Sequence, residues 1–182
     1  MPNALRSAVK FRFLPALLLL FSAVRLSCAT LERLSLSDMI AKSTAIERAT
    51  VSGSYTAVEG PVIYTHYKLQ VSEQLKGTAI TEMVVPGGSV NAVRQFFAGE
   101  PQFQPGDEYV FFLWTGKTGL TRIMGMTQGM FSVAPGGAAD PSVTRAASRE
   151  LMLDTTTGRP VKDQTLVMKL SDLRKQIKGG VE

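Results

Sequence analysis

The amino-acid sequence predicts a mainly β fold, a small antiparallel β-barrel of the oligonucleotide/oligosaccharide-binding (OB) type with a short helix near each end. Apolar and polar residues alternate with a period of two along several segments, and helical spacing is confined to the two ends. Glycine and proline divide the alternating segments into about seven short strands. A β-sandwich is the main alternative.

The amino-terminal segment has the three-part layout of a secretory signal. Basic residues precede an apolar run from Phe13 to Val24, and small residues follow it. This run of 12 residues ends at Arg25, whereas a membrane-spanning helix needs about 20 apolar residues. We therefore expect residues 1–29 to be a signal peptide that is removed on export.

Ser27 and Ala29 are small residues at the positions that signal peptidase requires for a cut before Thr30. The expected mature protein is residues 30–182, one domain, located in the periplasm or outside the cell. A rival cut before Cys28 would leave a lipid-modified cysteine that holds the protein at the membrane. Arg25, however, stands where such sites usually carry leucine.

Composition restricts the partners of the mature chain. The signal peptide contains four basic residues and no acidic one, so its removal lowers the formal charge from +5 to +1. A nearly neutral domain lacks the basic stripe that binds nucleic acid, and we expect no nucleic-acid partner. Because Cys28 is the only cysteine, the mature chain is expected to have no internal disulfide.

Two short helices are expected, one near each end of the mature chain. The first follows Ser37, the predicted N-cap, and runs through Ser43. The second is Asp172 to Lys178, capped by Ser171, and its apolar residues Leu173 and Ile177 are spaced to face the body of the protein.

Strands fill most of the sequence between these helices. A weak first strand near Thr50 is closed by the turn Gly60-Pro61, and the most regular alternation follows it. This alternating strand, Ile63 to Ser72, has one apolar face, and its other face carries Tyr64, His66, Lys68 and Gln70. Glu82 to Val85 is its expected antiparallel partner.

The segment Glu108 to Trp114 is apolar on both faces, which predicts a central strand. Together with Leu120–Met126 and Met130–Val133 it is expected to form a three-stranded meander. A further strand is possible within Ser142–Leu153. Long loops are expected at Gly87–Gln104 and Pro135–Pro141.

Four strings carry a resemblance to known proteins: Leu34 to Gly53 (LSLSDMIAKSTAIERATVSG), Tyr64 to Gly77 (YTHYKLQVSEQLKG), Pro105 to Leu113 (PGDEYVFFL) and Gly125 to Val133 (GMTQGMFSV). They resemble a group of exported bacterial proteins of undefined activity. In order and spacing they are also distantly similar to the netrin-like, OB-type barrel of the tissue inhibitors of metalloproteinases. The resemblance covers roughly Leu34 to Val133 and implies the barrel.

In those inhibitors the amino-terminal cysteine chelates the protease zinc through its amine and carbonyl, and disulfides hold the amino end against the barrel. Here only Cys28 could match that cysteine, and only after a cut directly before it. The other cysteines of the family are absent. The resemblance thus implies inhibition of an extracellular metalloprotease only as an alternative function.

The candidate chemical groups are few. His66, the only histidine, is expected to be solvated or locally hydrogen-bonded rather than catalytic, because catalytic triads and zinc sites need further groups beside it. Met124, Met126 and Met130 are soft thioether ligands that could bind Cu(I), with Met124 and Met126 on one strand face, although methionine also fills cores.

We therefore expect an exported, non-enzymatic binding module without a cofactor. Its partner is expected to be another exported protein, contacted by the loops 87–104 and 135–141. The strand face with Tyr64, His66, Lys68 and Gln70 is a second candidate surface. A metalloprotease inhibitor or accessory protein and a methionine-based copper-binding protein are the alternatives.

Overall fold

The computed structural model describes residues 30–180, so the predicted signal peptide, including Cys28, lies outside the described residues. The strands are β1 (Thr30–Glu32), β2 (Ala45–Glu59), β3 (Val62–Lys76), β4 (Glu82–Pro86), β5 (Gly88–Val90), β6 (Val93–Gln95), β7 (Glu108–Thr115), β8 (Thr121–Ile123), β9 (Met130–Val133), β10 (Ser142–Arg145), β11 (Leu151–Leu153), β12 (Pro160–Val161) and β13 (Leu166–Lys169), and the helices are α2 (Leu36–Lys42) and α3 (Leu170–Gly179).

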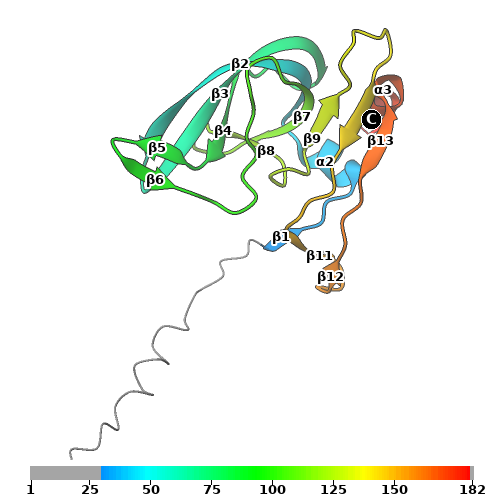
Figure 1. The fold of residues 1–182 in the computed structure, drawn as a ribbon. Helices are drawn as coiled ribbons and strands as arrows, with labels where there is room; N and C mark the ends of the chain where they lie inside the picture. The colour runs from blue at the N-terminus through cyan, green and yellow to red at the C-terminus, as the bar shows by residue number, and fades with distance from the viewer. Residues whose placement is uncertain (1–29, 181–182) are drawn as a thin grey trace, which may run out of the picture.

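The predicted mainly β fold with a short helix near each end is confirmed (Figure 1). The main sheet has the order β13-β10-β9-β7-β2-β3-β4, with β8 on β7, and its pairs are antiparallel. The sheet curls until β4 lies beside β8, but these two strands form no ladder. The sheet is therefore not closed, and its shape is consistent with an open barrel or a sandwich.

The β2–β3 hairpin is the longest part of the sheet. Each strand has 15 residues, so the first strand is not weak, as the sequence indicated, but long. Gly60 closes the hairpin with a φ of 61°, a conformation that glycine adopts without steric cost. The pairing of β3 with β4 is antiparallel, as predicted. The hairpin joins the rest of the main sheet through the pairing of β2 with β7.

Strand β7 lies in the middle of the sheet and is buried on both faces, as its sequence predicts. Alternate side chains enter two separate clusters. The helix-side core, between the sheet and the helices, contains Leu34, Met39, Ile40, Ile46, Val110, Phe112, Phe131, Val143, Leu170, Leu173 and Ile177. The inner core, on the concave side, contains Ala45, Ala49, Val51, Tyr67, Leu69, Met83, Val85, Phe103, Phe111, Leu113 and Ile123.

The predicted three-stranded meander is wrong. Strands β8 and β9 both pair with β7 and together form one antiparallel partner interrupted at 124–129. The N–H of Met124 donates to the carbonyl of Phe112, and the N–H of Phe112 donates to the carbonyl of Gly129, each at 2.8 Å. A Cβ at position 129 would lie 2.6 Å from the carbonyl oxygen of Met124, so glycine permits this bulge.

Both helix caps differ from the sequence prediction. Ser35, not Ser37, caps α2: its Oγ accepts from the N–H of Asp38 at 3.0 Å, and the Asp38 carboxylate accepts from the N–H of Ser35 at 3.1 Å. The Ser35 hydroxyl also donates to the Asp38 carboxylate, and this hydrogen bond, followed by the one from the Ser35 N–H, holds the pKa of Asp38 below its usual value. At the other end, Ser171 lies inside α3.

The carboxylate of Asp140 takes the capping role at α3, accepting from both the N–H and the Oγ of Ser171 at 2.9 Å. The predicted burial of Leu173 and Ile177 is confirmed. Asp140 belongs to the loop between β9 and β10, so this loop anchors the terminal helix to the sheet.

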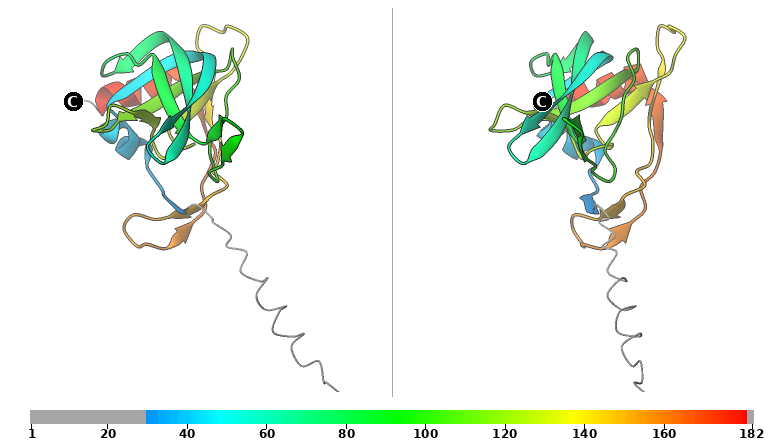
Figure 2. Two further views of the ribbon diagram at one scale, coloured as in Figure 1. Left: turned by 90° about the vertical axis from the view of Figure 1, so that its left-hand side faces the viewer. Right: turned by 60° about the vertical axis from the view of Figure 1, so that its left-hand side comes forward.

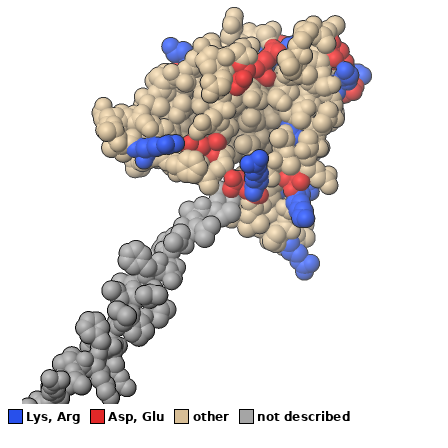
Figure 3. Space-filling model, viewed as in Figure 1, with Lys and Arg blue, Asp and Glu red and all other residues tan. Residues whose placement is uncertain are grey.

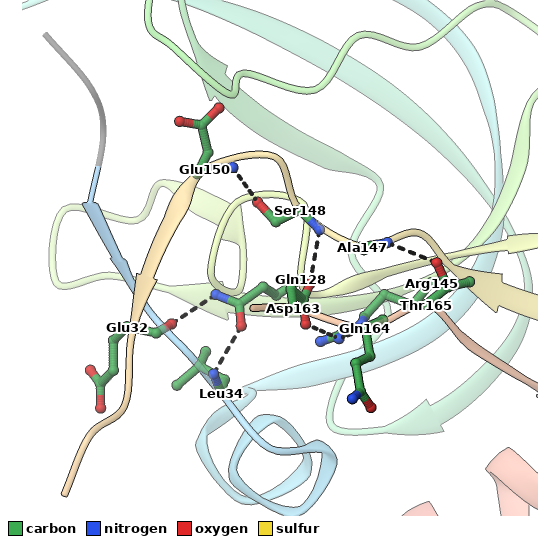
Figure 4. Close-up of polar contacts among 10 residues, drawn as sticks. All are labelled: Glu32, Leu34, Gln128, Arg145, Ala147, Ser148, Glu150, Asp163, Gln164 and Thr165. Atoms are coloured by element: carbon green, nitrogen blue, oxygen red, sulfur yellow. Dashed lines mark hydrogen bonds and ion pairs between the residues drawn. The ribbon is translucent and has the colours of Figure 1, made fainter. Parts of the chain in front are cut away.

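A smaller sheet, β1-β11-β12, lies below the main sheet in the views of Figures 1 and 2. Buried Gln128 of the 124–129 bulge connects the two parts: its Oε1 accepts from the N–H of Leu34 and its Nε2 donates to the carbonyl of Glu32, both at 2.8 Å (Figure 4). The bulge therefore holds the amino-terminal segment in place.

The segment predicted as one strand, Ser142–Leu153, is divided into β10 and β11. Where the chain leaves β10, the buried carboxylate of Asp163, which follows β12, pairs with Nη2 of Arg145 at 2.6 Å. The same carboxylate accepts from the N–H of Ser148, between β10 and β11, at 2.9 Å (Figure 4). The side chains of Arg145 and Asp163 are 3% and 1% exposed. This ion pair fixes the direction in which the chain leaves β10.

Candidate functional site

A pocket of about 510 Å³ opens where β4 and β8 lie side by side without pairing. We call it the seam pocket. Its volume falls within the range of about 300–1,000 Å³ that is typical of small-molecule sites. It is lined by Val84, Val85 and Pro86 of β4, Phe96, Phe97, Ala98 and Pro101 of the loop after β6, Arg122 and Ile123 of β8, and Met126 of the bulge.

Strand β4 contributes an unpaired edge to this pocket. Hydrogen bonds from Leu69 to Thr81 and from Gly87 to Ile63 flank the β3–β4 ladder. Since hydrogen-bonded pairs alternate in an antiparallel ladder, Val84 directs its backbone N–H and C=O away from β3. On that side β8 forms no ladder with it. The seam therefore results from strand pairing that stops one strand short of closure.

The loop after β6 forms the exposed wall of the pocket. Phe96 is 68% exposed and Phe97 is 37% exposed. The loop is held at its start, where Gln95 Oε1 accepts from the N–H of Ile63 at 2.6 Å, and near its end, where Glu100 accepts from the N–H of Phe97 at 3.1 Å. Two aromatic side chains are thus displayed on an anchored loop.

Arg122 is the one charged residue among those that line the seam pocket. Its Nη2 donates to the hydroxyl of Tyr64 at 2.9 Å, and its guanidinium carbon lies 5.4 Å from the centre of the same ring. Within residues 30–180, no acidic side chain lies within ion-pair distance of it. A guanidinium has five N–H donors, so most of its donors stay free.

His66 lies between two carboxylates on the convex face of the β2–β3 hairpin. Its Nδ1 is 2.9 Å from Oε1 of Glu82, and its Nε2 is 3.5 Å from Oε1 of Glu59. The ring of Tyr55 stacks on it at 4.5 Å between centroids. His66 is 5% exposed, so a solvated histidine is wrong and a locally hydrogen-bonded one is confirmed.

This His66 cluster does not have the geometry of a triad or a metal site. The two ring nitrogens face different carboxylates, and Nε2 has no hydrogen-bond partner among the described residues. Within residues 30–180, no group of three or more His, Cys, Asp or Glu could hold a metal ion. Because His66 is buried and does not line the seam pocket, its packing role is the better supported one.

The four residues predicted to share one exposed strand face are divided by the structure. Tyr64 and His66 are buried, whereas Lys68 and Gln70 are exposed. Tyr55 covers His66, and Arg122 reaches Tyr64, which removes both rings from solvent. The continuous polar surface that the alternation indicated is therefore wrong for its first half.

The three candidate copper ligands lie in different surroundings. Met124 packs against the helix-side core and Met130 against the inner core, while Met126 lines the seam pocket. Since β8 ends at Ile123, the shared strand face predicted for Met124 and Met126 is also wrong. Copper binding stays a prediction, and so does metalloprotease inhibition, which depends on Cys28 outside the described residues.

Sequence reasoning identified part of the seam pocket. The predicted long loop Gly87–Gln104 contains Phe96 and Phe97, and two adjacent aromatic residues among polar ones are a usable signal. Arg122 gave no such signal, because an isolated arginine beside a predicted turn is ordinary. The other predicted contact loop, Pro135–Pro141, caps α3 through Asp140 instead of lining the pocket.

No protein-family model matches the chain, and no curated protein matches it at a significant level. None of the helices in the described part of the chain has the length and apolar character needed to cross a bilayer. On the face shown in Figure 3, basic and acidic side chains are interspersed and much of the surface carries neither. The geometry of the seam pocket is therefore the main guide to function.

Proposed function

We propose that this chain is an exported, non-enzymatic binding module whose seam pocket takes the apolar part of a ligand. The observation that carries the proposal is the pocket itself, an apolar cavity with Phe96 and Phe97 exposed on its outer wall. Burying apolar surface contributes roughly 25 cal/mol per Å². A ligand that covers these rings is stabilised by that burial.

Two further features support binding rather than chemistry. The histidine is buried between carboxylates and does not line the seam pocket, and no serine, threonine or tyrosine hydroxyl lies in hydrogen-bond reach of its nitrogens within residues 30–180. The pocket lining contains one ionisable side chain, Arg122. General acid–base catalysis needs a group that can exchange a proton near neutral pH, and an arginine does not.

Export belongs to the same proposal and rests on the sequence alone. The amino-terminal layout and the small residues before Thr30 support removal of residues 1–29. Amino-terminal sequencing of the protein purified from the envelope or the medium tests this directly. A chain that starts at Thr30 is the expected result, and an intact Met1 in the envelope fraction contradicts it.

The binding test uses a neutral, environment-sensitive fluorophore, N-phenyl-1-naphthylamine, titrated into the purified protein. Saturable fluorescence enhancement is expected. Ala98 lines the pocket and is partly buried, so Ala98→Trp places an indole in the cavity and should abolish most of the enhancement.

Ala134→Trp is the matched control, because Ala134 is exposed and does not line the pocket. It should bind the probe as the unmodified protein does. Thermal unfolding of both variants shows whether the fold is kept. The absence of saturable binding, or equal binding by the Ala98→Trp variant, would overturn the proposal.

A further inference from the structure

We infer that the ligand of the seam pocket is a single-chain anionic amphiphile of the fatty-acid class, with its alkyl chain in the pocket and its carboxylate on Arg122. This inference rests on the proposed binding function and names the ligand chemistry. Three features of the pocket support it: the position of the guanidinium, the missing counter-charge and the apolar lining.

The guanidinium of Arg122 is held in a fixed place. Nη2 donates to the hydroxyl of Tyr64, and the ring of Tyr64 lies beneath the guanidinium. Tyr64 is itself 9% exposed, so the anchor is rigid. Nε and Nη1 make no hydrogen bond to any residue of the range 30–180. A planar guanidinium with free donors matches a carboxylate through two parallel hydrogen bonds.

The neighbouring carboxylates are engaged elsewhere. Glu82 binds His66 and Tyr55, Glu59 faces His66, and Glu100 accepts from the N–H of Phe97. Arg122 is half-buried, and a cation that is partly removed from water is stabilised by an opposite charge. In the part of the chain that the structure describes, no side chain supplies this charge, so an anionic ligand group fits there.

The remainder of the lining is apolar, with aliphatic, proline, methionine and phenylalanine side chains. A ligand that satisfies both parts has one anionic end and one apolar end. A cationic amphiphile would be repelled by Arg122, and a neutral one such as an alcohol would accept a hydrogen bond without supplying the counter-charge. A ligand made of charged groups alone would leave the apolar lining uncovered.

A peptide strand added to the edge of β4 is the main competing occupant. This edge is short, and it includes Pro86, which has no N–H to donate. In addition β8 lies beside β4, within the space that an added strand would need. The acyl chain, which requires no backbone pairing, is therefore favoured by the geometry.

The experiment uses the mature protein, residues 30–182. It measures how well four C12 amphiphiles, each below its micelle concentration, displace N-phenyl-1-naphthylamine. They are dodecanoate, dodecanol, dodecyl phosphate and dodecyltrimethylammonium. Dodecanoate is expected to displace the probe at a concentration about tenfold or more below that of dodecanol, since hydrogen bonds to charged groups are worth about 1.5–3 kcal/mol. The trimethylammonium compound is expected to be the weakest.

Arg122→Gln is expected to weaken dodecanoate binding about tenfold more than it weakens dodecanol binding, since only the carboxylate loses its charged partner. Arg122→Lys keeps the charge without the planar fork and should give an intermediate value. Lys117→Gln, which removes an exposed charge in the β7–β8 turn outside the pocket, is the matched control and should change nothing. Thermal unfolding shows whether each variant keeps its fold.

The outcomes separate this inference from the proposed function. Equal displacement by dodecanoate and dodecanol, or an Arg122→Gln variant that binds dodecanoate normally, overturns the fatty-acid inference while the apolar binding site stands. Dodecyl phosphate that binds tenfold better than dodecanoate overturns the carboxylate assignment in favour of a phosphate headgroup. No saturable probe binding by the unmodified protein overturns the binding function and this inference together.

Discussion

The two faces of strand β7 are both buried, but they differ in how completely they are sealed. The helix-side core is covered by α2 and α3, and none of its members lines the seam pocket. The inner core lies on the same face as the buried carboxylate Glu47, and its members Val85 and Ile123 also line the seam pocket. One strand thus borders a closed core on one side and, on the other side, a core that continues into the seam pocket.

The largest effect on stability is expected for a substitution in the helix-side core. Phe112 is fully buried in the helix-side core, and Phe112→Ala should lower the free energy of unfolding by about 3–5 kcal/mol. Phe96→Ala is the matched control from the open side, and because Phe96 is 68% exposed it should change stability by about 0.5 kcal/mol or less. Urea unfolding measures both, and equal losses would refute the contrast.

The second prediction tests whether a buried ion pair contributes as much to the free energy of unfolding as a residue of the apolar core does. Asp163→Asn leaves the guanidinium of Arg145, 3% exposed, without its counter-charge, and should cost about 3 kcal/mol. Asp172→Asn is the control, since Asp172 pairs with Lys175 at the surface and is worth about 0–1 kcal/mol. A loss below 1 kcal/mol for Asp163→Asn would show that this ion pair is replaceable.

A smaller effect concerns the cap of α2, which covers the helix-side core. Ser35→Ala removes the side-chain acceptor for the N–H of Asp38 and should cost about 1 kcal/mol. The pKa of Asp38 should rise toward its usual value, because Ser35 lowers it. NMR titration of Asp38 measures this. Ser37→Ala is the comparison at the neighbouring serine: it removes a hydroxyl that contacts Ser35 Oγ at 2.9 Å but neither backbone N–H bond of the cap, and its effect should be smaller.

The smallest expected effect is the pH dependence of stability produced by Glu47, which lies on the same face as the inner core. Burial raises the pKa of Glu47 above its ordinary value of 4.5, so the folded chain keeps this proton to higher pH than the unfolded chain does. Stability contributed by this group therefore falls as pH rises from 4.5 through the raised pKa. Glu47→Gln removes this dependence, and its unfolding free energy relative to the unmodified protein should increase across that window. A constant difference would contradict the assignment.

Much of the fold follows from local patterns. The two apolar faces of Glu108–Trp114 predicted β7 and the division of its side chains, and the alternation of Ile63–Ser72 predicted β3. Glycine and proline located most turns. The N-cap of α2 was assigned to the wrong serine although the sequence holds a signal for it: Asp38 stands three residues after Ser35, the spacing of a capping box, whereas Ile40 stands three residues after Ser37.

The site was less predictable than the fold. Phe96 and Phe97 were inside the predicted loop, but Arg122 came to the pocket only through its contact with Tyr64, 58 residues earlier in the chain. His66 was expected on a solvated face, and cross-strand packing by Tyr55 buries it. Neither contact has a local sequence signal, because each joins residues on different strands.

The sequence by itself determined that this chain forms antiparallel strands with helices at both ends, since side-chain alternation and turn residues act over a few positions. Tertiary structure alone decided where the sheet stops. The bulge at Met124–Gly129 divides one strand into β8 and β9, and β4 then meets β8 without pairing. The bulge brings Gly129 close to the backbone carbonyls of Met124 and Phe112, and only a residue without a Cβ fits there. This packing exists only in the folded chain.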